Sequence, residues 1–306
     1  HPFDVKIGDE VSHIGKGESE FTVIFHKIPS MKELLTSTSI ALGEAYMDGK
    51  LEIEGDLYHA LNMFLGQMGK FSTDTKKLKN IIFTSKSKAN QKKEVSSHYD
   101  IGNDFYKMWL DETMSYSCGY FKNENDTLYQ AQCNKVDRIL EKLNLSDGMT
   151  LCDIGCGWGF LLIEAAKKYN IKGVGITLSR EQKAKFEQRI KEENLSDRLE
   201  VKLLDYRDLP KQHMEFDRVV SVGMIEHVGR GNYEEFMQCV KSVLKQGGVF
   251  VLHFISALKE YPGDAWVKKY IFPGGVIPSL REIMQIAGEL RFYTVDVESL
   301  RRHYNK

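Results

Sequence analysis

Apolar and polar residues follow two alternating patterns over residues 149–255. Short runs rich in aliphatic and β-branched residues predict five strands, at residues 149–154, 173–177, 199–204, 218–222 and 249–255. Between them, apolar side chains recur at helical spacing over residues 160–168, 180–193 and 233–244. Strands that alternate with helices form a parallel sheet covered on both faces, so we expect an α/β domain. Gly247 and Gly248 are expected to end the last helix, and residues 292–297 to add a sixth strand.

The pattern before residue 94 is different. Residues 21–25 form a β-rich run, and Ser30 and Asp56 each precede a segment with helical spacing, where their side chains can act as N-caps. Residues 40–47 also have helical spacing. Short strands mixed with short helices predict a small α+β domain over residues 1–69.

Residues 70–93 have the composition of a linker. They hold eight lysines against one aspartate and few large apolar residues. Such a charged run is typical of a solvated connector between domains. The alternative interpretation is attraction to anionic lipid head groups, worth about 1 kcal/mol per lysine near a membrane surface.

Composition narrows the functional classes. A chain of 306 residues is long enough for two domains. The net charge of −1 provides no general attraction to nucleic acid. Five cysteines without a Cys-x-x-Cys pair argue for a reducing compartment and against a zinc site or a disulfide framework. No apolar run reaches the ~18–20 residues of a membrane span. The chain lacks an initial methionine, so we expect both ends to be incomplete.

A glycine-rich loop separates the first strand of the α/β region from its helix. Gly155, Gly157 and Gly159 allow the backbone to approach a ligand, and N–H groups at the helix start can hold a negative group. A dinucleotide site also needs an acidic residue about 20 positions further on. Residues 173–179 contain none. The loop therefore favours S-adenosylmethionine over NAD as the cofactor.

The expected cofactor site extends over three strand ends. Its residues are Asp153, Gly155, Cys156, Gly157, Trp158 and Gly159 after the first strand; Thr177, Leu178, Ser179 and Gln182 near the ribose; and Asp205, Tyr206 and Arg207 near the adenine. Helix capping is the alternative interpretation for Thr177 and Ser179. A surface loop is the alternative for residues 205–207, and a plain tight turn for the glycines.

These motifs resemble the cyclopropane-fatty-acyl-phospholipid synthase family, which also includes mycolic acid cyclopropane synthases. The matching stretches are residues 97–106, 116–121, 153–159, 177–179 with Gln182, 223–229, 252–253 and 271–275. The resemblance implies a Rossmann-like class I methyltransferase domain over residues 94–306, after a smaller lipid-associated domain at residues 1–69. Family members extend well beyond Tyr304, and many form dimers, so a homodimer is among the expected assemblies.

The resemblance also implies an activity and a base. The enzyme would convert a cis double bond of a phospholipid acyl chain to a cyclopropane through a carbocation, with bicarbonate as the base. The positions that match the bicarbonate site are Cys118, Glu226, His253, Ile255 and Tyr304, while Tyr116 and Ser117 close over the methionine end of the cofactor. Taken singly, His253 is equally typical of a core histidine, Glu226 of a helix start and Cys118 of a small buried hydrophobe.

Aromatic residues are dense between residues 99 and 121, as a pocket for a cation would require, although most are equally typical of a core. Residues 258–275 mix aromatics with lysines and suit either a lipid–water interface or a packed lid. We expect a cytoplasmic enzyme bound peripherally to the inner face of the membrane, with no nucleic acid partner and no metal. The rival hypotheses are a methyltransferase of this family that acts on another lipid or an amine, and a non-catalytic lipid-binding protein.

Overall fold

The computed structural model describes residues 2–82, 87–88 and 102–305 and divides the chain into two compact units. The first unit comprises residues 1–83 together with residues 262–271. The second comprises residues 84–261 and 272–306. Within the described residues, no helix is long and apolar enough to cross a membrane.

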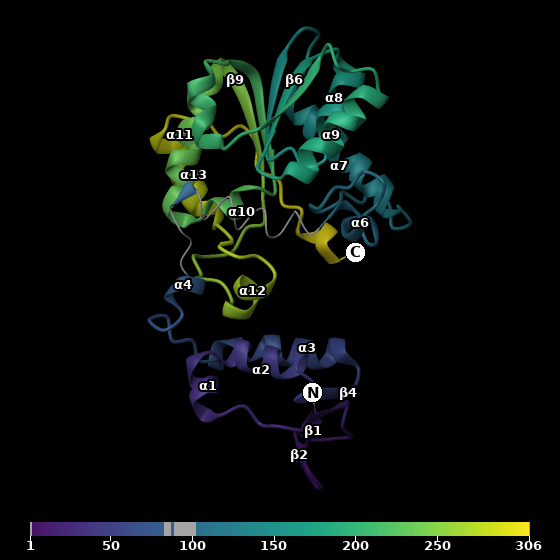
Figure 1. Cartoon of the computed structure of the whole chain (residues 1–306), viewed down its shortest axis with the longest axis vertical. Coiled ribbons are helices and arrows are strands. Elements are labelled where there is room, and N and C mark those ends of the chain that lie inside the picture. The colour runs from purple at the N-terminus through teal and green to yellow at the C-terminus, as the bar shows by residue number, and fades with distance from the viewer. Residues whose placement is uncertain (1, 83–86, 89–101, 306) are drawn as a thin grey trace. The chain divides into compact units, whose positions relative to one another are not determined.

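The first unit is built on a four-stranded sheet with the order β2-β1-β3-β4 (Figure 1). Its strands are β1 (Phe3–Ile7), β2 (Glu10–Ile14), β3 (Phe21–Phe25) and β4 (Leu51–Gly55). Its helical segments are α1 (Met31–Thr36), α2 (Thr38–Met47), α3 (Leu57–Gly66), η1 (Met68–Lys70), α4 (Lys79–Ile82) and α12 (Ala265–Tyr270). The expected caps are present: Ser30 forms a capping box with Glu33, and the Asp56 carboxylate accepts from the backbone N–H of Tyr58.

Part of the expected linker belongs to this unit. Thr73 forms a β-bridge with Ser37, and Leu78 is buried against Ala265 of α12. The lysine content of residues 70–82 predicted a flexible connector. These contacts instead pack the segment into the first unit. The rest of the linker lies almost wholly outside the described residues.

The second unit contains a five-stranded parallel sheet with the order β7-β6-β5-β8-β9 (Figure 1). Its strands are β5 (Thr150–Ile154), β6 (Lys172–Thr177), β7 (Leu199–Leu203), β8 (Phe216–Val222) and β9 (Leu244–His253). Its helical segments are α6 (Asn103–Lys107), α7 (Leu128–Leu143), α8 (Phe160–Tyr169), α9 (Arg180–Glu192), η2 (Tyr206–Gln212), α10 (Ile225–Val228), η3 (Arg230–Asn232), α11 (Tyr233–Val243), α13 (Leu280–Glu289) and η4 (Arg301–Asn305).

Helices cover both faces of this sheet, as the alternating pattern predicted. One core cluster joins the sheet to α7, α8 and α9, with Phe186 and Leu162 fully buried. The other joins it to α11, α13 and η2, with Phe236 and Val240 fully buried. All five predicted strands are present, and the carboxyl ends of parallel strands meet at one edge, where ligands bind in open α/β sheets.

Two predictions near the end of the sheet are wrong. Helix α11 ends at Val243, and Gly247 and Gly248 lie inside β9. They belong to an irregular stretch where the β8–β9 register shifts, and the φ of +75° at Gly247 suits such a bulge. Residues 292–297 form no sixth strand: they have no ladder partner among the described residues, and Tyr293 and Val295 are exposed. Ion pairs from Lys142 to Asp296 and from Arg138 to Glu298 hold this stretch on α7 instead.

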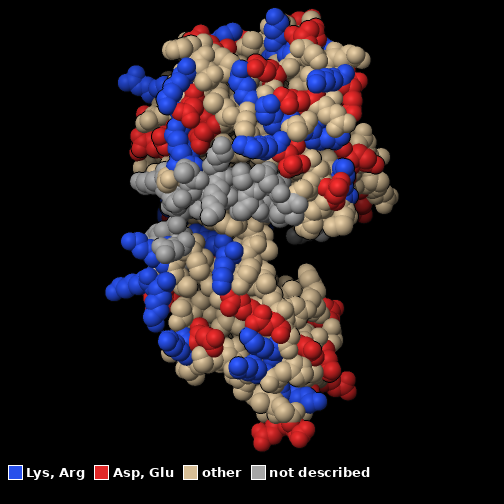
Figure 2. All heavy atoms as spheres, viewed as in Figure 1, with Lys and Arg blue, Asp and Glu red and all other residues tan. Residues whose placement is uncertain are grey.

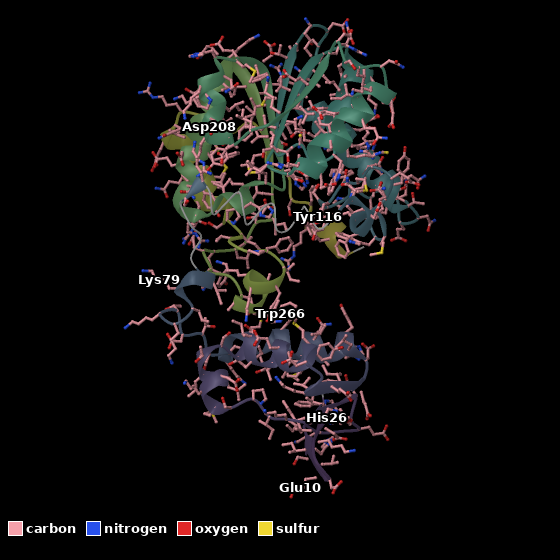
Figure 3. The ribbon with its side chains drawn as sticks, in the orientation of Figure 1. Glu10, His26, Lys79, Tyr116, Asp208 and Trp266 are labelled. Atoms are coloured by element: carbon pink, nitrogen blue, oxygen red, sulfur yellow. The ribbon has the colours of Figure 1, made fainter. Side chains whose placement is uncertain are left out.

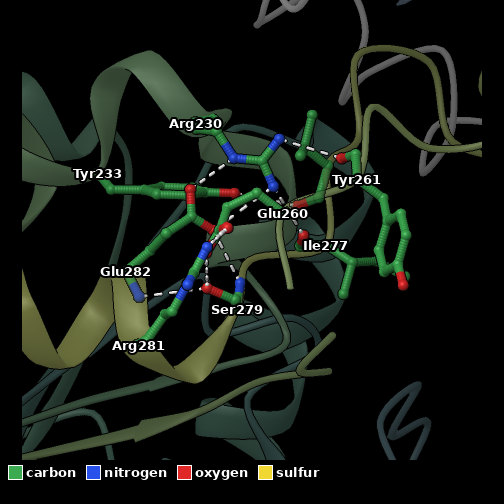
Figure 4. Close-up of polar contacts among 9 residues, drawn as sticks. Arg230, Tyr233, Glu260, Tyr261, Ile277, Ser279, Arg281 and Glu282 are labelled. Atoms are coloured by element: carbon green, nitrogen blue, oxygen red, sulfur yellow. Dashed lines mark hydrogen bonds and ion pairs between the residues drawn. The ribbon is translucent and has the colours of Figure 1, made fainter. Parts of the chain in front are cut away.

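The insertion between β9 and α13 is held at its neck by a polar network (Figure 4). Arg230 pairs with Glu282 and donates to the carbonyl of Tyr261 at 3.0 Å and to that of Ile277 at 3.4 Å. Glu260 accepts from Ser279 and is paired with Arg281. These bonds join residues before and after the insertion within the second unit.

The tip of the insertion, residues 262–271, belongs to the first unit. The Lys269 ammonium and the Tyr270 hydroxyl both donate to Glu44 of α2, at 2.5 and 2.7 Å. Trp266 packs so closely on α2 that a Cβ at Gly43 would lie 2.4 Å from its ring. The packed-lid interpretation of residues 258–275 therefore describes this tip better than an interface with lipid.

Candidate active site

The glycine loop after β5 has three distinct environments. Gly155, Gly157 and Gly159 all have positive φ, at +83°, +55° and +85°, which L side chains rarely adopt. A Cβ at Gly159 would lie 2.0 Å from the Phe186 ring, and one at Gly155 would lie 2.7 Å from the side chain of Met224. A Cβ at Gly157 would meet nothing within 4 Å. The outer two glycines permit close packing, while Gly157 faces open space.

That space is a pocket at the carboxyl ends of β5, β6, β7 and β8, with an empty volume of about 1220 Å³ including its open mouth. Every residue expected to bind the cofactor lines it except Ser179. The lining set includes Tyr116, Ser117, Asp153, Gly155, Cys156, Gly157, Trp158, Gly159, Thr177, Leu178, Gln182, Asp205, Tyr206 and Arg207. Tyr116 is labelled on the second unit in Figure 3.

Ser179 has the alternative role of helix N-cap. Its hydroxyl accepts from the Gln182 backbone N–H at 3.2 Å, and the residue is fully buried away from the pocket lining. The Thr177 hydroxyl donates to the Gln182 side-chain oxygen at 2.7 Å. The cap thus holds Thr177 and Gln182 together at the pocket wall, where the amide of Gln182 can meet ribose hydroxyls.

Residues 205–207 are not a surface loop. Arg207 is paired in bidentate fashion with Asp205, at 2.8 and 2.6 Å, and both side chains are largely buried. Asp205 also accepts from the Arg207 backbone N–H and so caps η2. The Tyr206 hydroxyl is buried and has no hydrogen-bond partner among the described residues. Burial raises the pKa of Tyr206, so this hydroxyl remains a donor.

A buried lysine in this pocket was not foreseen. Lys135 of α7 is 4 % exposed, lines the pocket and donates to the Ser117 hydroxyl oxygen at 2.8 Å. Asp153, also in the lining, is 3 % exposed, and its Oδ1 has no partner among the described residues. Burial raises the pKa of Asp153 to about 7 against the opposing effect of the Lys135 charge.

Residues beyond the expected set also contribute to the lining, among them residues 113–115 and, after β8, Val222, Gly223, Met224, His227 and Val228. Met114 has a φ of +59°, unusual for a residue with a side chain, yet it is buried against the aromatic cluster. The Arg189 guanidinium fixes this turn by donating to the carbonyls of Thr113 and Glu112, at 3.1 and 2.8 Å. The family-like stretch 223–229 was the one signal in the sequence that pointed to part of this set.

Three of the five expected base residues, Glu226, His253 and Ile255, lie at or just after the ends of β8 and β9. Glu226, on the short helix α10, accepts from the Ile255 backbone N–H at 2.8 Å through Oε1. Its Oε2 is buried without a partner in the described structure, and so is Nδ1 of His253. The carbonyl of His253 accepts from Gly223, which connects the end of β9 to the turn before α10.

Burial sets the charge of both groups. Burial raises the pKa of Glu226, although the Ile255 N–H opposes this shift. Burial, with a smaller effect of the Lys135 charge in the same direction, lowers the pKa of His253 to about 4. His253 is therefore neutral at pH 7 and can donate one hydrogen bond without carrying charge.

Tyr304 lies on the last described helix, η4, whose His303 contacts the segment just after Cys118. His303 stacks on Tyr120 with ring centroids 4.4 Å apart, and its Nδ1 accepts from the Phe121 backbone N–H at 3.1 Å. Tyr304 is thereby placed where Cys118 and Glu226 influence it: burial, with smaller effects of these two groups, raises its pKa to about 12. Of the five expected base residues, none lines the cofactor pocket itself.

Aromatic side chains cluster beside the pocket. Tyr106 lies 5.2 Å from Trp158 and 5.9 Å from Tyr116 between ring centroids, and Trp109 lies 4.9 Å from Tyr116. Phe272, which follows the insertion tip, lies 6.5 Å from Tyr116. The first half of the 97–106 stretch, residues 97–101, is outside the described residues.

Comparisons of the sequence with protein families and with known proteins identify the same family. The model for mycolic acid cyclopropane synthetase matches residues 86–306, and a domain of unknown function matches residues 1–76. A probable fatty acid methyltransferase of Pseudomonas putida is 39% identical over 323 residues, covering 100% of this chain and 78% of the relative. The cyclopropane-fatty-acyl-phospholipid synthase of Escherichia coli strain K12 is 40% identical over 260 residues, covering 83% of this chain and 66% of the relative.

Solved structures agree. The cyclopropane synthase MmaA2 from Mycobacterium tuberculosis has a TM-score of 0.66 at 33% identity and covers 72% of this chain and 80% of its own. A mycolic acid cyclopropane synthase complexed with SAH and CTAB has a TM-score of 0.65 at 34% identity, covering 70% and 79%. These structures confirm the expected fold class, a Rossmann-like class I methyltransferase domain, here preceded by the small N-terminal sheet.

Proposed function

The chain belongs to the mycolic acid cyclopropane synthetase family of methyltransferases, and from this premise we propose that it is a cyclopropane fatty acid synthase. It would use S-adenosylmethionine to convert a cis double bond of a phospholipid acyl chain to a cyclopropane, through a carbocation on that chain. One observation carries the proposal: the glycine-lined cofactor pocket shares α10 and its preceding turn with a buried Glu226 carboxylate oxygen that has no hydrogen-bond partner among the described residues.

The pocket residues fit S-adenosylmethionine. The open space at Gly157 is a cradle that a side chain would fill. The unpartnered Asp153 Oδ1 suits the ammonium of the amino-acid end, and the unpartnered Tyr206 hydroxyl provides a polar contact at the opposite strand end. The side-chain amide of Gln182, which the Thr177 hydroxyl holds in place, would bind the ribose hydroxyls.

The base site fits a small protonated anion such as bicarbonate. Glu226 Oε2 can accept that anion's own proton, while the ring of neutral His253 and the Tyr304 hydroxyl can donate to its oxygens. When bound, S-adenosylmethionine supplies an electrophilic methyl group, and bicarbonate supplies the base that removes a proton from the transferred carbon.

The protein's own residues would orient and protect the reaction. The Ile255 N–H fixes one oxygen of Glu226, so the other keeps a constant direction. The aromatic cluster around Tyr116 would offer ring faces to a cation. We infer that Cys118 contributes by packing and by its weak S–H, since burial raises its thiol pKa.

We further propose peripheral association with the inner face of the cytoplasmic membrane. Acidic and basic side chains are mixed on the face drawn in Figure 2, so no single-sign field covers it. The exposed lysines of residues 70–79, including Lys79 on α4 (Figure 3), would add attraction of about 1 kcal/mol each near anionic lipid. Lys86, Lys92 and Lys93 lie outside the described residues.

The decisive test is product analysis. The full chain is incubated with vesicles of a cis-unsaturated phosphatidylglycerol and methyl-labelled cofactor, and the lipids are then extracted. We expect the acyl chain to gain one CH₂ unit and its proton spectrum to show the upfield methylene signal of a cyclopropane. Cofactor that is bound but never consumed with any unsaturated lipid would instead indicate a binding protein.

The similarity to a fatty acid methyltransferase supports a second candidate, methyl transfer without ring closure. Both reactions add one CH₂ unit, so mass alone does not separate them. A methyl-branched product keeps a double bond that ozone cleaves, whereas a cyclopropane is resistant. An amine acceptor would leave the acyl chains unlabelled and the label in the head group or in another compound.

His253→Ala tests the base site directly. If the ring holds the anion that takes the final proton, methyl transfer should continue while ring closure fails, with partial recovery on added bicarbonate. The folded state is checked by thermal unfolding. A large drop in melting temperature without branched or unsaturated products would make His253 a core histidine.

A further inference from the structure

Lys135 is a buried charged residue, and neither the glycine loop nor the base site explains why its charge is there. In the described structure its ammonium makes one hydrogen bond, 2.8 Å long, to the neutral hydroxyl of Ser117. A lysine ammonium has three donors, and a buried charge is costly unless an opposite charge compensates it. A residue that is 4 % exposed, lines a pocket and has spare donors is therefore arranged for an anionic ligand group.

Asp153 supplies the complementary charge in the same pocket. It precedes Gly155 at the end of β5, and its Oδ1 is buried without a partner among the described residues. Burial lowers the pKa of Lys135 to about 8, while the charges of Asp111, Cys118 and Asp153 oppose that shift. The two side chains thus present one cationic and one anionic group to a single ligand space.

We propose that Lys135 binds the α-carboxylate at the amino-acid end of the cofactor and makes the pocket selective for ligands that carry it. This rests on the proposed function, because S-adenosylmethionine is the ligand with a free amino-acid group. Asp153 faces the ammonium of the same group, and the α8 N-terminus beside Gly159 adds its positive end. Lys135 also donates to the Ser117 hydroxyl. The bound carboxylate and Ser117, which is expected to close over the methionine end of the cofactor, would then share one ammonium group.

The contact predicts a specific pattern of affinities. S-Adenosylhomocysteine carries the amino-acid group, whereas 5′-methylthioadenosine has the same nucleoside and a thioether but no carboxylate. A charge-assisted hydrogen bond in a buried site corresponds to about 10- to 100-fold in affinity. Loss of Lys135 should therefore weaken the first ligand by that factor and leave the second within about twofold.

The experiment is calorimetric titration of the full chain with both ligands. Lys135→Met removes the charge, Lys135→Arg retains it, and Lys241→Met is the matched control, because Lys241 is an exposed lysine on α11. We expect Lys135→Met to lose affinity for S-adenosylhomocysteine alone, Lys135→Arg to retain part of it, and Lys241→Met to match the wild type.

Three results would overturn the assignment. Equal weakening of both ligands would make Lys135 a structural support of the pocket. Unchanged binding with lost turnover would assign its charge to the base site near Cys118 and His253. Unchanged binding and turnover would leave it without a role in either.

A wild-type protein that binds neither ligand would contradict the proposed function itself. Should Lys135→Met fail to fold, Lys135→Gln and the decarboxylated analogue of S-adenosylhomocysteine provide the same comparison. The wild type should bind that analogue about 10- to 100-fold more weakly, and Lys135→Gln should show little difference between the two.

Discussion

Gly157 and Gly159 form a matched pair of substitutions, because they share a loop and differ in surroundings. An added Cβ meets nothing within 4 Å at Gly157 but lies 2.0 Å from the ring of Phe186 at Gly159. Both have positive φ, so alanine costs about 1–2 kcal/mol of backbone strain at either position. Overpacking against Phe186 adds about 1–3 kcal/mol at Gly159. The free energy of unfolding should therefore fall by about 1–2 kcal/mol for Gly157→Ala and by about 2–5 kcal/mol for Gly159→Ala.

Cofactor binding should show the reverse order. A methyl group at residue 157 projects into the space that the ligand needs, so Gly157→Ala should weaken S-adenosylhomocysteine by roughly tenfold or more, and Gly157→Val should abolish its binding. Gly159→Ala, where it folds, should retain more affinity than Gly157→Ala, since its methyl points into the core. Urea unfolding gives the stabilities and calorimetry the affinities. Wild-type affinity in Gly157→Val would refute the placement of the cofactor over this turn.

Three further changes test other parts of the molecule. Glu226→Gln should leave the affinity for S-adenosylhomocysteine nearly intact and lower turnover by roughly 10²-fold, the scale of acid–base and orientation effects; lost binding with unchanged turnover per bound enzyme would make Glu226 a cofactor ligand. Asp153 is protonated below its pKa of about 7 and then no longer attracts the ligand's ammonium. The affinity for S-adenosylhomocysteine should therefore fall by about eightfold from pH 7.5 to 6. Asp153→Asn should remove this dependence, and a slope that persists in that variant would assign it to another group. Gly43→Val should push Trp266 off α2, because a Cβ there lies 2.4 Å from the ring, and expose the insertion tip to limited proteolysis; an unchanged cleavage pattern would count against that packing.

The inner strands β5, β6 and β8 were predictable because they are largely buried on both faces and therefore read as short apolar runs. The glycine loop was predictable for a related reason, since positive φ and close approach leave few alternatives to glycine. The two wrong predictions share a physical cause. Gly247 serves a bulge within β9 as readily as a helix end, and a β-rich run such as 292–297 needs a partner edge that local pattern does not reveal.

The burial of Lys135 could not be predicted from the local sequence pattern. On a helix with an apolar face, one lysine among several charged residues is typical of a solvated position. Its burial depends on Ser117 and on the end of β5, which are 18 residues away on either side in the sequence. Ser179 shows the converse, because its cap position was readable from the sequence while its absence from the pocket wall was not.

The arrangement separates two tasks along one edge of the sheet. The ends of β5, β6 and β7 and the turn after β8 carry residues that line the cofactor pocket, whereas Glu226 on α10 and His253 at the end of β9 are outside that lining. Changes to the lining residues should therefore act on cofactor affinity, and changes to Glu226 and His253 on turnover and product. Lys135 lies where both meet, since it donates to Ser117 and its charge lowers the pKa of His253.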